Sequence, residues 1–570
     1  MSNIVKTFAI TTLLLLMVGC GGTQTTKTDD TDNITPYTQV KEQMREYIKK
    51  QMDRQNLVGI SVALVDDQTI VWQEGFGYAD KKNGIKATPQ TRYHVASITK
   101  VFNAMAVMKL QEEGIMDIDK PLKTYLPSFS IKSRFGSTDG ITPRTLMSHH
   151  SGIIGDWYDK MYADNPYNYT EYVDLIKDEY VAYAPNTILA YSNVGITLLG
   201  DALEQSAGQN YTEFMEENLL KPMEMNNSYI KTVLEGDCKS YREAEEVKDY
   251  PTGMIPDGGL NSSVSDLSHL AMMINADGKY NGKTILNPKS LKEMQSVQNA
   301  DVALDFGDKV GLGLFIEDNI LSGRDRIYHH GGDTGTHHSF FAVTKNSKLG
   351  VVVMSNSDET PSESIAIELL TKAYEAKSGI KLEHNNTLAK LEKRSDIEGT
   401  YASSEGKITF EKKGDGFYTM ALMGKTISLK LGEDNRYHNR NMMFGEEQMA
   451  LYTEEINGKT YLIDENSWKK SAIGVKVEQK PISTVWQERL GEYHIINQME
   501  PEEMQIKKVV TKIEDGYFMF NVEMKSGDKV SYLLELVNDD EAIIEGVGRS
   551  MRETIRMVDD EFHYSGLRFR

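Results

Sequence analysis

Cysteine is scarce in this chain, which has only Cys20 and Cys238 among its 570 residues. We expect Cys20 to carry a lipid, for reasons given below, and Cys238 then has no partner within the chain. The fold must therefore be stabilised by packing and not by disulfides, even in an oxidising compartment. We interpret Cys238 as structural, because a cysteine nucleophile needs activating neighbours and the adjacent Asp237 disfavours the thiolate.

An excess of basic residues is also lacking. The formal net charge is -21, with 63 Lys and Arg against 84 Asp and Glu. Nucleic-acid binding needs a basic surface that neutralises phosphates, so we exclude a nucleic-acid partner. The hydrophobic share of 39% and the charged share of 26% are ordinary for soluble globular proteins. The length predicts about two to four domains.

Long hydrophobic runs are missing apart from one near the N-terminus. Residues 8–18 form an apolar run that is too short to span a bilayer but typical of a secretory signal peptide. The run ends in Met17-Val18-Gly19-Cys20, which resembles a bacterial lipobox with Cys20 as the acylated residue. A plain secretory signal with an incidental cysteine is the alternative. We expect a signal peptide at 1–19, followed by a disordered tether at 20–36.

This N-terminus implies a location and a partner. A lipid on Cys20 would anchor the protein to a membrane after export across the cytoplasmic membrane. The protein would then be periplasmic, attached to the outer membrane, or exposed on the cell surface. The residue after Cys20 is Gly21, which is not an inner-membrane retention signal of the Asp type.

The pattern of secondary structure changes along the chain. Residues 37–380 mix helical and strand patterns, and a polar, linker-like stretch follows at 381–394. We expect the helices predicted at 37–55 and 362–376 to pack on one sheet. Beyond the linker, apolar and polar residues alternate with a period of two, which is typical of half-buried strands.

The C-terminal part is predicted to contain two β-rich repeats, 395–482 and 483–570. Gly414-Asp415-Gly416-Phe417-Tyr418 is echoed by Glu514-Asp515-Gly516-Tyr517-Phe518. Two small antiparallel barrels, or one larger barrel, would fit this pattern. No grouping of Ser, His and acidic residues stands out there, so we expect no chemistry in this region.

A serine and a lysine are the most informative pair. Ser97-Ile98-Thr99-Lys100 precedes the almost wholly apolar residues 101–110. Residues three apart share one face of a helix, and so apolar a run predicts a buried helix. A buried amine beside a serine can activate the hydroxyl as a nucleophile. The alternative is a helix N-terminus with an exposed lysine, so the motif needs support from other segments.

Two further segments supply that support. Tyr191-Ser192-Asn193 offers a phenol, which loses its proton more readily near a lysine, and an amide that can both donate and accept hydrogen bonds. Residues 328–335, with the sequence Tyr-His-His-Gly-Gly-Asp-Thr-Gly, precede a strand-like segment. Their glycines allow a backbone to approach a ligand closely.

Together these motifs closely resemble the serine β-lactamase and penicillin-binding protein superfamily, on its class C β-lactamase-like branch. S-x-x-K, Y-x-N and H-x-G occur in the family's order, and residues 141–153 and 258–262 look like further family signatures. The resemblance covers about residues 58–376. It implies a mixed α/β (α+β) fold, in which helices flank an antiparallel sheet and a mostly helical subdomain borders the active site.

The resemblance also implies a role for each motif residue. Ser97 is the expected acylated nucleophile, and Lys100 is its proton partner, with a pKa kept near neutral by burial and nearby positive charge. Tyr191 is expected to act as the general base in acylation and as the acid for the leaving group. Asn193 is expected to position the lysine and the substrate, and His329 stands where β-lactamases have the lysine of K-T-G.

Backbone groups complete the expected site. The N–H groups of Ser97 and Gly332 would form the oxyanion hole, and His330 and Gly331 would contact the substrate. A histidine at position 329 is mostly neutral at pH 7, so it would hold a substrate carboxylate less firmly than a lysine. We therefore expect a two-step esterase or peptidase reaction, as in the esterase- and D-aminopeptidase-like members, in preference to efficient β-lactam hydrolysis.

We expect no metal and no other cofactor. Histidine doublets at 149–150, 329–330 and 337–338 suggest zinc, but adjacent residues of a strand point to opposite faces and no His-Glu-x-x-His motif occurs. The expected partners are a small-molecule or peptide substrate and a membrane, and no oligomeric state follows from the sequence. Two alternatives stay open: a penicillin-binding or ligand-sensing lipoprotein with little turnover, and a D,D-carboxypeptidase or β-lactamase.

Overall fold

The part of the chain that is described begins after the predicted N-terminal signal. The computed structural model describes residues 36–234, 236, 238–383, 388–422, 425–439, 449–466, 469–497 and 505–570. The predicted signal peptide at 1–19, Cys20 and nearly all of the predicted tether lie outside these ranges. Within them, no helix combines the length and the apolar character that a membrane span requires.

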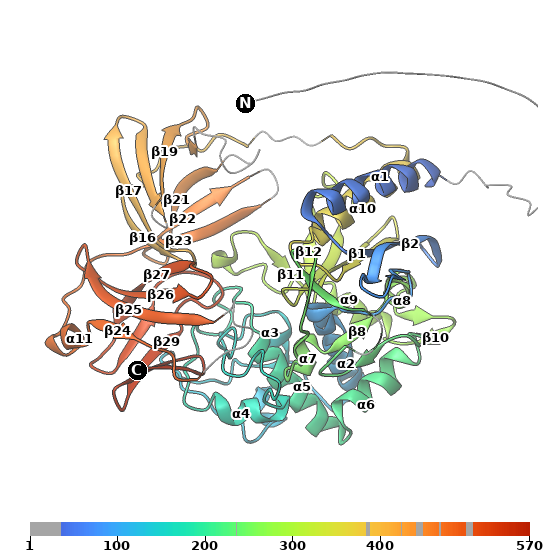
Figure 1. The fold of residues 1–570 in the computed structure, drawn as a ribbon, viewed down its shortest axis with the longest axis horizontal. Helices are drawn as coiled ribbons and strands as arrows, with labels where there is room; N and C mark the ends of the chain where they lie inside the picture. The colour runs from blue at the N-terminus through green and yellow to red at the C-terminus, as the bar shows by residue number, and fades with distance from the viewer. Residues whose placement is uncertain are drawn as a thin grey trace, which may run out of the picture.

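An eight-stranded antiparallel sheet forms the centre of the N-terminal half (Figure 1). In spatial order its strands are β11 (Lys309–Val310), β12 (Phe315–Glu317), β13 (Ile327–Asp333), β14 (His338–Thr344), β15 (Leu349–Ser355), β1 (Gly59–Asp66), β2 (Thr69–Asp80) and β3 (Ile85–Lys86). β1 and β15 pair along their whole length and are almost wholly buried. Their many valines suit strands that are covered on both faces.

Helices cover the two faces of this sheet. α1 (Thr38–Gln55) and α10 (Ser362–Ser378) pack on one face, where they meet Ile60 and Val62 of β1. The alternating residues Ala63 and Val65 of β1 join the core on the other face. The first and last helices of this domain therefore share one sheet, as expected from the sequence.

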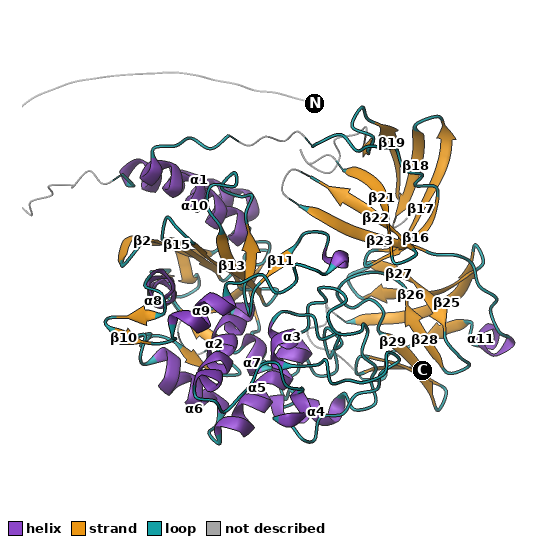
Figure 2. Ribbon diagram, turned by 180° about the vertical axis from the view of Figure 1, so that it is seen from behind, coloured by secondary structure: helices purple, strands orange, loops and turns teal. Residues whose placement is uncertain are grey.

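A mostly helical subdomain is inserted between β3 and β11 (Figures 1 and 2). Its α-helices are α2 (Thr99–Glu112), α3 (Pro143–Met147), α4 (Tyr172–Leu175), α5 (Asn193–Ala207), α6 (Tyr211–Met215), α7 (Ile255–Gly258), α8 (Val264–Asn275) and α9 (Pro288–Met294). Its short helical turns are η1 (Ala96–Ile98), η2 (Leu122–Thr124), η3 (Tyr169–Glu171), η4 (Glu216–Leu220) and η5 (Ala303–Asp305). Its short strands are β4 (Tyr93–His94), β5 (Tyr229–Ile230), β6 (Ser240–Arg242), β7 (Glu245–Val247), β8 (Leu260–Ser262), β9 (Lys279–Tyr280) and β10 (Lys283–Thr284).

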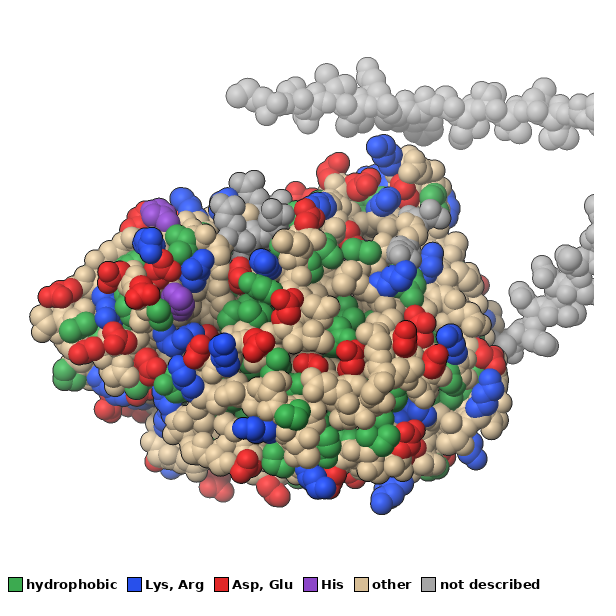
Figure 3. All heavy atoms as spheres, turned by 90° about the horizontal axis from the view of Figure 1, so that it is seen from below, with side chains coloured by type: hydrophobic (Ala, Val, Ile, Leu, Met, Phe, Trp, Pro, Cys, Tyr) green, Lys and Arg blue, Asp and Glu red, His purple; other side chains and the backbone are tan. Residues whose placement is uncertain are grey.

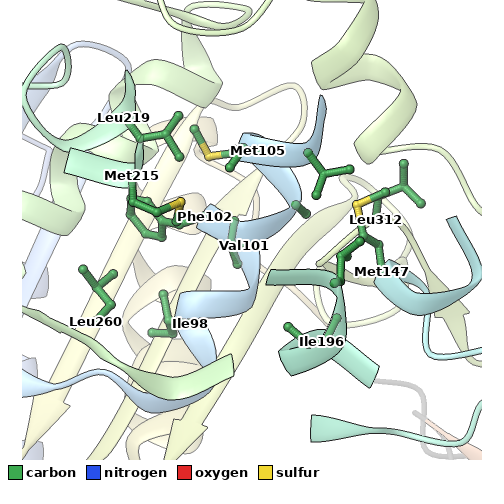
Figure 4. Close-up of a cluster of buried hydrophobic side chains, with 14 of the residues drawn as sticks. Ile98, Val101, Phe102, Met105, Met147, Ile196, Met215, Leu219, Leu260 and Leu312 are labelled. Atoms are coloured by element: carbon green, nitrogen blue, oxygen red, sulfur yellow. The ribbon is translucent and has the colours of Figure 1, made fainter. Parts of the chain in front are cut away.

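α2 is the buried centre of this subdomain. Every residue from Thr99 to Met108 is buried, as the apolar run predicts. Figure 4 shows its apolar side chains among those of neighbouring segments, which include Met147, Ile196, Met215, Leu219, Leu260 and Leu312. A helix that is packed on all sides holds the residues of its first turn in fixed positions.

Two β-rich units follow the linker. β16–β23 form a closed barrel: β16 (Gly399–Ser403), β17 (Gly406–Gly414), β18 (Phe417–Leu422), β19 (Lys425–Leu431), β20 (Tyr437–Asn439), β21 (Ala450–Ile456), β22 (Lys459–Glu465) and β23 (Lys470–Lys476). A short helix, α11 (Thr484–Glu488), leads to a second set of eight strands: β24 (Gly491–Tyr493), β25 (Ile506–Glu514), β26 (Tyr517–Met524), β27 (Lys529–Leu536), β28 (Glu541–Ile544), β29 (Thr554–Val558), β30 (Glu561–Tyr564) and β31 (Leu567–Phe569). The predicted fold class, a mixed α/β domain followed by all-β barrels, is confirmed.

The two β units resemble each other in detail. The echoed Asp-Gly pairs lie at equivalent turns, between the second and third strand of each unit. Gly416 and Gly516 have φ angles of 71° and 75°, which favour glycine. In the second unit, an isolated bridge between Ile495 and Phe569 links the segment after β24 to the last strand.

The second β unit docks on the helical subdomain (Figure 2). Arg134 donates to Thr554 at 2.8 Å and to Glu541 at 2.9 Å. A Cβ on Gly566 would lie 2.6 Å from the indole ring of Trp157, so a glycine is needed for this close approach. The loop that carries Trp157 is therefore held between the helical subdomain and the second β unit.

Charges of both signs are spread over the surface. On the face seen in Figure 3, Lys and Arg side chains are mixed with Asp and Glu side chains. Exposed ion pairs such as Lys413–Glu411 contribute little, because water screens them. The stability of the fold therefore depends mainly on its hydrophobic cores.

Candidate active site

Ser97 lies in the short turn η1, at the entry to α2. Thr99 holds this turn, because its hydroxyl donates to the carbonyl of Ala96 at 2.6 Å and accepts the N–H of Leu260 at 3.0 Å. Ala96 has a φ of 46°, in the left-handed region that costs a residue with a Cβ about 1 kcal/mol. Such strain clusters at functional sites. Here it accompanies a serine that lines a cleft.

Lys100 contacts the serine as the S-x-x-K spacing predicts. Its Nζ donates to Ser97 Oγ at 2.9 Å. The side chain is buried, and Nζ also donates to the carbonyl oxygen of Asp257 at 2.9 Å and to its carboxylate at 3.2 Å. An ammonium group has three N–H donors, and Lys100 also interacts with Tyr191 through a side-chain hydrogen bond. Lys100 therefore links the serine hydroxyl to both Tyr191 and Asp257.

The predicted near-neutral pKa of Lys100 is wrong. Burial acts to lower this pKa, but the negative charge of Asp257, with a contribution from Tyr191, outweighs burial and raises the pKa above its ordinary value. The prediction failed because Asp257 was missed. Its only distinguishing sequence feature is its place directly before residues 258–262, and α7 turns it toward α2.

Tyr191 lies between two cations. The centroid of its ring is 5.1 Å from Lys100 Nζ and 5.0 Å from Arg549 Cζ. The ring of His149 lies 4.1 Å away, and burial lowers the pKa of His149 well below its ordinary value, so this neighbour is neutral at pH 7. The Tyr191 ring is therefore flanked by two positive charges.

Asn193 is the first residue of α5. The helix is capped by Ser192, whose hydroxyl accepts the N–H of Gly195 at 2.8 Å. Asn193 Nδ2 donates to Asp156 Oδ1 at 2.7 Å, and its Oδ1 is buried with no partner in the described part of the chain. Asp156, on a loop without a recognisable motif, therefore sets the orientation of the Asn193 amide.

The C-terminal β region supplies a second partner for Asp156. Arg549, between β28 and β29, donates to Asp156 Oδ2 from Nη2 at 2.7 Å and from Nε at 3.2 Å. No chemistry was expected in this region, and the structure shows that one of its side chains lines the cleft. The two residues are 393 positions apart, and no motif surrounds either of them. Only the packing of the second β unit brings them together.

β13 places the two histidines of the third motif on opposite faces of the sheet. The ring of His330 is 6.3 Å from that of Tyr191, whereas the ring of His329 stacks on Phe340 at 5.2 Å. His330, and not the predicted His329, therefore lies beside Tyr191, although both histidines line the cleft. Burial lowers the pKa of His329 to about 4 and that of His330 to about 3, so neither is a cation at pH 7.

Gly332 lets β13 approach the turn that carries Ser97. A Cβ at this position would lie 2.1 Å from the carbonyl oxygen of Val95, the residue before η1. Ser339 Oγ donates to the same carbonyl at 2.9 Å. This close contact between β13 and Val95 places the backbone of Gly332 beside the turn of Ser97. The predicted oxyanion hole would form there. Gly331, the preceding residue, lines the cleft.

The cleft has two compartments that meet at Ser97. The larger, about 1100 Å³, is also lined by Tyr191, His330 and Arg549, and by Lys469 of the first β unit. The smaller, about 390 Å³, is also lined by His94 and Asp249, among others. A substrate can therefore extend in two directions from one hydroxyl group, and the C-terminal units border the larger side.

The histidine doublets and Cys238 do not lie in surroundings typical of a metal site or of a reactive thiol. Within the described ranges, no group of three or more His, Cys, Asp or Glu side chains is arranged to hold a metal ion. His150 Nε2 lies 2.8 Å from Asp305, and the ring of His337 packs edge-on against that of His94. Burial raises the pKa of the Cys238 thiol, which suits a structural residue.

A buried carboxyl group lies behind the site, at the docking surface of the second β unit. Glu553 accepts the N–H of Gly155 and the hydroxyl of Ser565, each at 2.8 Å, and burial raises its pKa from 4.5 to about 7. Between these pH values the folded protein binds more protons than the unfolded chain. The free energy of unfolding therefore falls as the pH rises from about 4.5 to 7, by about 3 kcal/mol for this group.

Replacing Glu553 with glutamine is expected to remove this contribution, because the amide keeps an acceptor for Gly155 but does not titrate. Chemical denaturation at pH 5 and pH 8 measures the effect. The loss of stability between these pH values should be about 3 kcal/mol smaller in Glu553→Gln than in the wild type. The exposed Glu213→Gln should follow the wild type, and equal pH dependence in wild type and Glu553→Gln would contradict the expectation.

Comparisons with known proteins show the family of this chain. A family model described as Beta-lactamase matches residues 44–375. Protein flp of Staphylococcus aureus (strain MW2) is 23% identical over 330 residues, which are 55% of this chain and 63% of flp. The chain thus spans less than two thirds of that relative's length.

Solved structures share the fold. The octameric penicillin-binding protein homologue from Pyrococcus abyssi has a TM-score of 0.53 at 24% identity, covering 74% of this chain and 98% of that one. SurE has a TM-score of 0.57 at 19% identity, covering 78% of this chain and all of that one (100%). At these identities the likeness concerns the fold alone.

Proposed function

This chain belongs to the β-lactamase family, and we propose that it is a lipid-anchored serine hydrolase that acts outside the cytoplasm. It would cleave an ester, amide or peptide bond through an acyl-enzyme on Ser97. The observation that carries the proposal is the 2.9 Å contact between Lys100 Nζ and Ser97 Oγ, in a cleft that Tyr191 also lines. The anchor on Cys20 rests on the lipobox-like sequence.

In the first step, Ser97 Oγ attacks the carbonyl carbon of the substrate while Tyr191, reacting as the phenolate, takes the hydroxyl proton. Lys100, as an ammonium group, stabilises the negative charge on the attacking oxygen. The substrate's carbonyl oxygen becomes negative and is stabilised by backbone donors at Ser97 and Gly332. Tyr191 then passes its proton to the leaving group, and the bond to that group breaks.

In the second step, a water molecule attacks the acyl group on Ser97. Tyr191 accepts a proton from this water, and the acyl–oxygen bond breaks with return of a proton to Ser97. The two cations beside Tyr191 support both proton transfers, since they stabilise the phenolate that each transfer uses. No step needs a metal or a cofactor.

The lack of positive charge on His329 and His330 affects which substrates the site can bind. Because burial lowers the pKa of His330 to about 3, this residue lacks the positive charge that would hold a β-lactam carboxylate. We therefore propose esters, amides or peptides as substrates, in line with the esterase- and D-aminopeptidase-like branch, ahead of efficient β-lactam hydrolysis.

A fluorophosphonate probe tests the proposal. It is expected to label the full-length protein at Ser97, as located by mass spectrometry of its peptides. A panel of p-nitrophenyl esters, D-amino-acid amides and a chromogenic cephalosporin should show faster turnover of an ester or an amide than of the cephalosporin. A folded protein without label at Ser97 would reject the proposal.

Two further assays, with a penicillin and with a pentapeptide stem, would favour the alternatives. A stable penicillin adduct without product release would favour a ligand-sensing lipoprotein. Release of D-alanine from a pentapeptide stem would favour a D,D-carboxypeptidase.

A further inference from the structure

A cation from the C-terminal β region reaches the candidate active site. The side chain of Arg549 crosses from the second β unit to Asp156, with contacts of 2.7 and 3.2 Å. The other carboxylate oxygen of Asp156 accepts from Asn193 at 2.7 Å, and Asp156 is only 4% exposed. A continuous chain of hydrogen bonds therefore joins the second β unit to the Y-x-N motif.

We propose that Arg549 is a positioning residue of the active site, which holds the amide of Asn193 in place through Asp156. The hydrolase domain would then be catalytically complete only when the second β unit is docked. This inference rests on the proposed function, since it concerns the rate of the same reaction.

The chemistry of a carboxylate fixes the orientation of Asn193. A carboxylate only accepts hydrogen bonds, so the NH₂ group of Asn193 must face Asp156 and its oxygen must point elsewhere. Without Arg549, Asp156 would lose both bonds to the guanidinium and would be a buried charge without a counter-ion. Such a charge is costly and reorients toward water, which would release the Asn193 amide.

Arg549 also acts on Tyr191 directly. Its Cζ lies 5.0 Å from the centre of the ring, and its side chain remains 47% exposed in the cleft. If this cation is removed, Lys100 is left as the nearby positive charge over the phenol. Both effects concern proton transfer and the orientation of catalytic groups, so we expect a change in kcat more than in KM.

The test compares full-length variants on the best substrate of the panel. Arg549→Gln is expected to lower kcat about tenfold to a hundredfold with KM changed less than about threefold, and Arg549→Lys should restore part of the rate. The matched control is Arg134→Gln. Arg134 also bridges the helical subdomain and the second β unit, through Glu541 and Thr554, but it does not line the cleft.

Three outcomes would be informative. An unchanged kcat in Arg549→Gln would overturn the inference. Equal losses in Arg549→Gln and Arg134→Gln, in step with equal losses of thermal stability, would also overturn it, because both arginines would then only hold the domains together. Failure of the wild type to react with the fluorophosphonate would instead reject the proposed function, which keeps the two conclusions separate.

Discussion

Replacing Ser97 with alanine is expected to lower kcat/KM by about 10⁴-fold or more while the fold stays intact. The hydroxyl makes one side-chain hydrogen bond, with Lys100, and it lines a cleft and not the core. Its removal therefore leaves no cavity in the packed interior. Catalysis is lost because no acyl-enzyme can form, and only binding and the backbone donors remain.

The measurement is kcat/KM on the best substrate, together with labelling by the fluorophosphonate. Thermal unfolding should be nearly unchanged in Ser97→Ala. A surface serine such as Ser296, which lies just beyond α9, serves as the control, and its alanine variant should react like the wild type. Substantial turnover by Ser97→Ala would mean that the reaction does not pass through this serine.

Replacing Lys100 with methionine is expected to cause two losses at once. The activity should fall by about 10³-fold or more, because no ammonium group stabilises the serine oxygen. The free energy of unfolding should fall by about 3–5 kcal/mol, because the buried carboxylate of Asp257 loses its counter-ion. Methionine is unbranched and of similar length, so the change in packing is small by comparison.

A second substitution separates the two losses. In Lys100→Met/Asp257→Asn the buried charge is gone, so most of the stability should return while the activity stays absent. Chemical denaturation and kcat/KM of the single and double variants check this. If the double variant were as unstable as Lys100→Met, the unpaired carboxylate would not be the cause. If Lys100→Met kept its activity, Lys100 would have no part in the reaction.

The contact between Ser97 and Lys100 could be predicted because it is local. Residues three positions apart meet where a helical turn runs into a helix, as η1 does into α2, whatever the rest of the chain does. The burial of α2 was equally predictable, since so few of its residues are polar. The alternating patterns of the C-terminal strands likewise predicted barrels, because a period of two leaves one face apolar.

Other parts of the site depend on contacts that carry no local signal. Asp257 meets Lys100 across 157 positions, and Arg549 meets Asp156 across 393. A single charged residue on a loop belongs to no periodic pattern, so the sequence does not indicate which residue it pairs with. The choice between His329 and His330 failed for a different reason, because a shift of one residue along a strand exchanges the two faces of a sheet.

The central strands of the sheet have a consequence for the order of folding. Ser355 of β15 donates to the carbonyl of Gly59 at the start of β1, although 296 positions separate them. Closing so long a loop costs entropy and slows folding. A chain that leaves the ribosome with its N-terminus first therefore carries Ser97 long before β13 exists to face it. The proposed hydrolytic activity would then begin only after β13 has been released and has paired with the sheet.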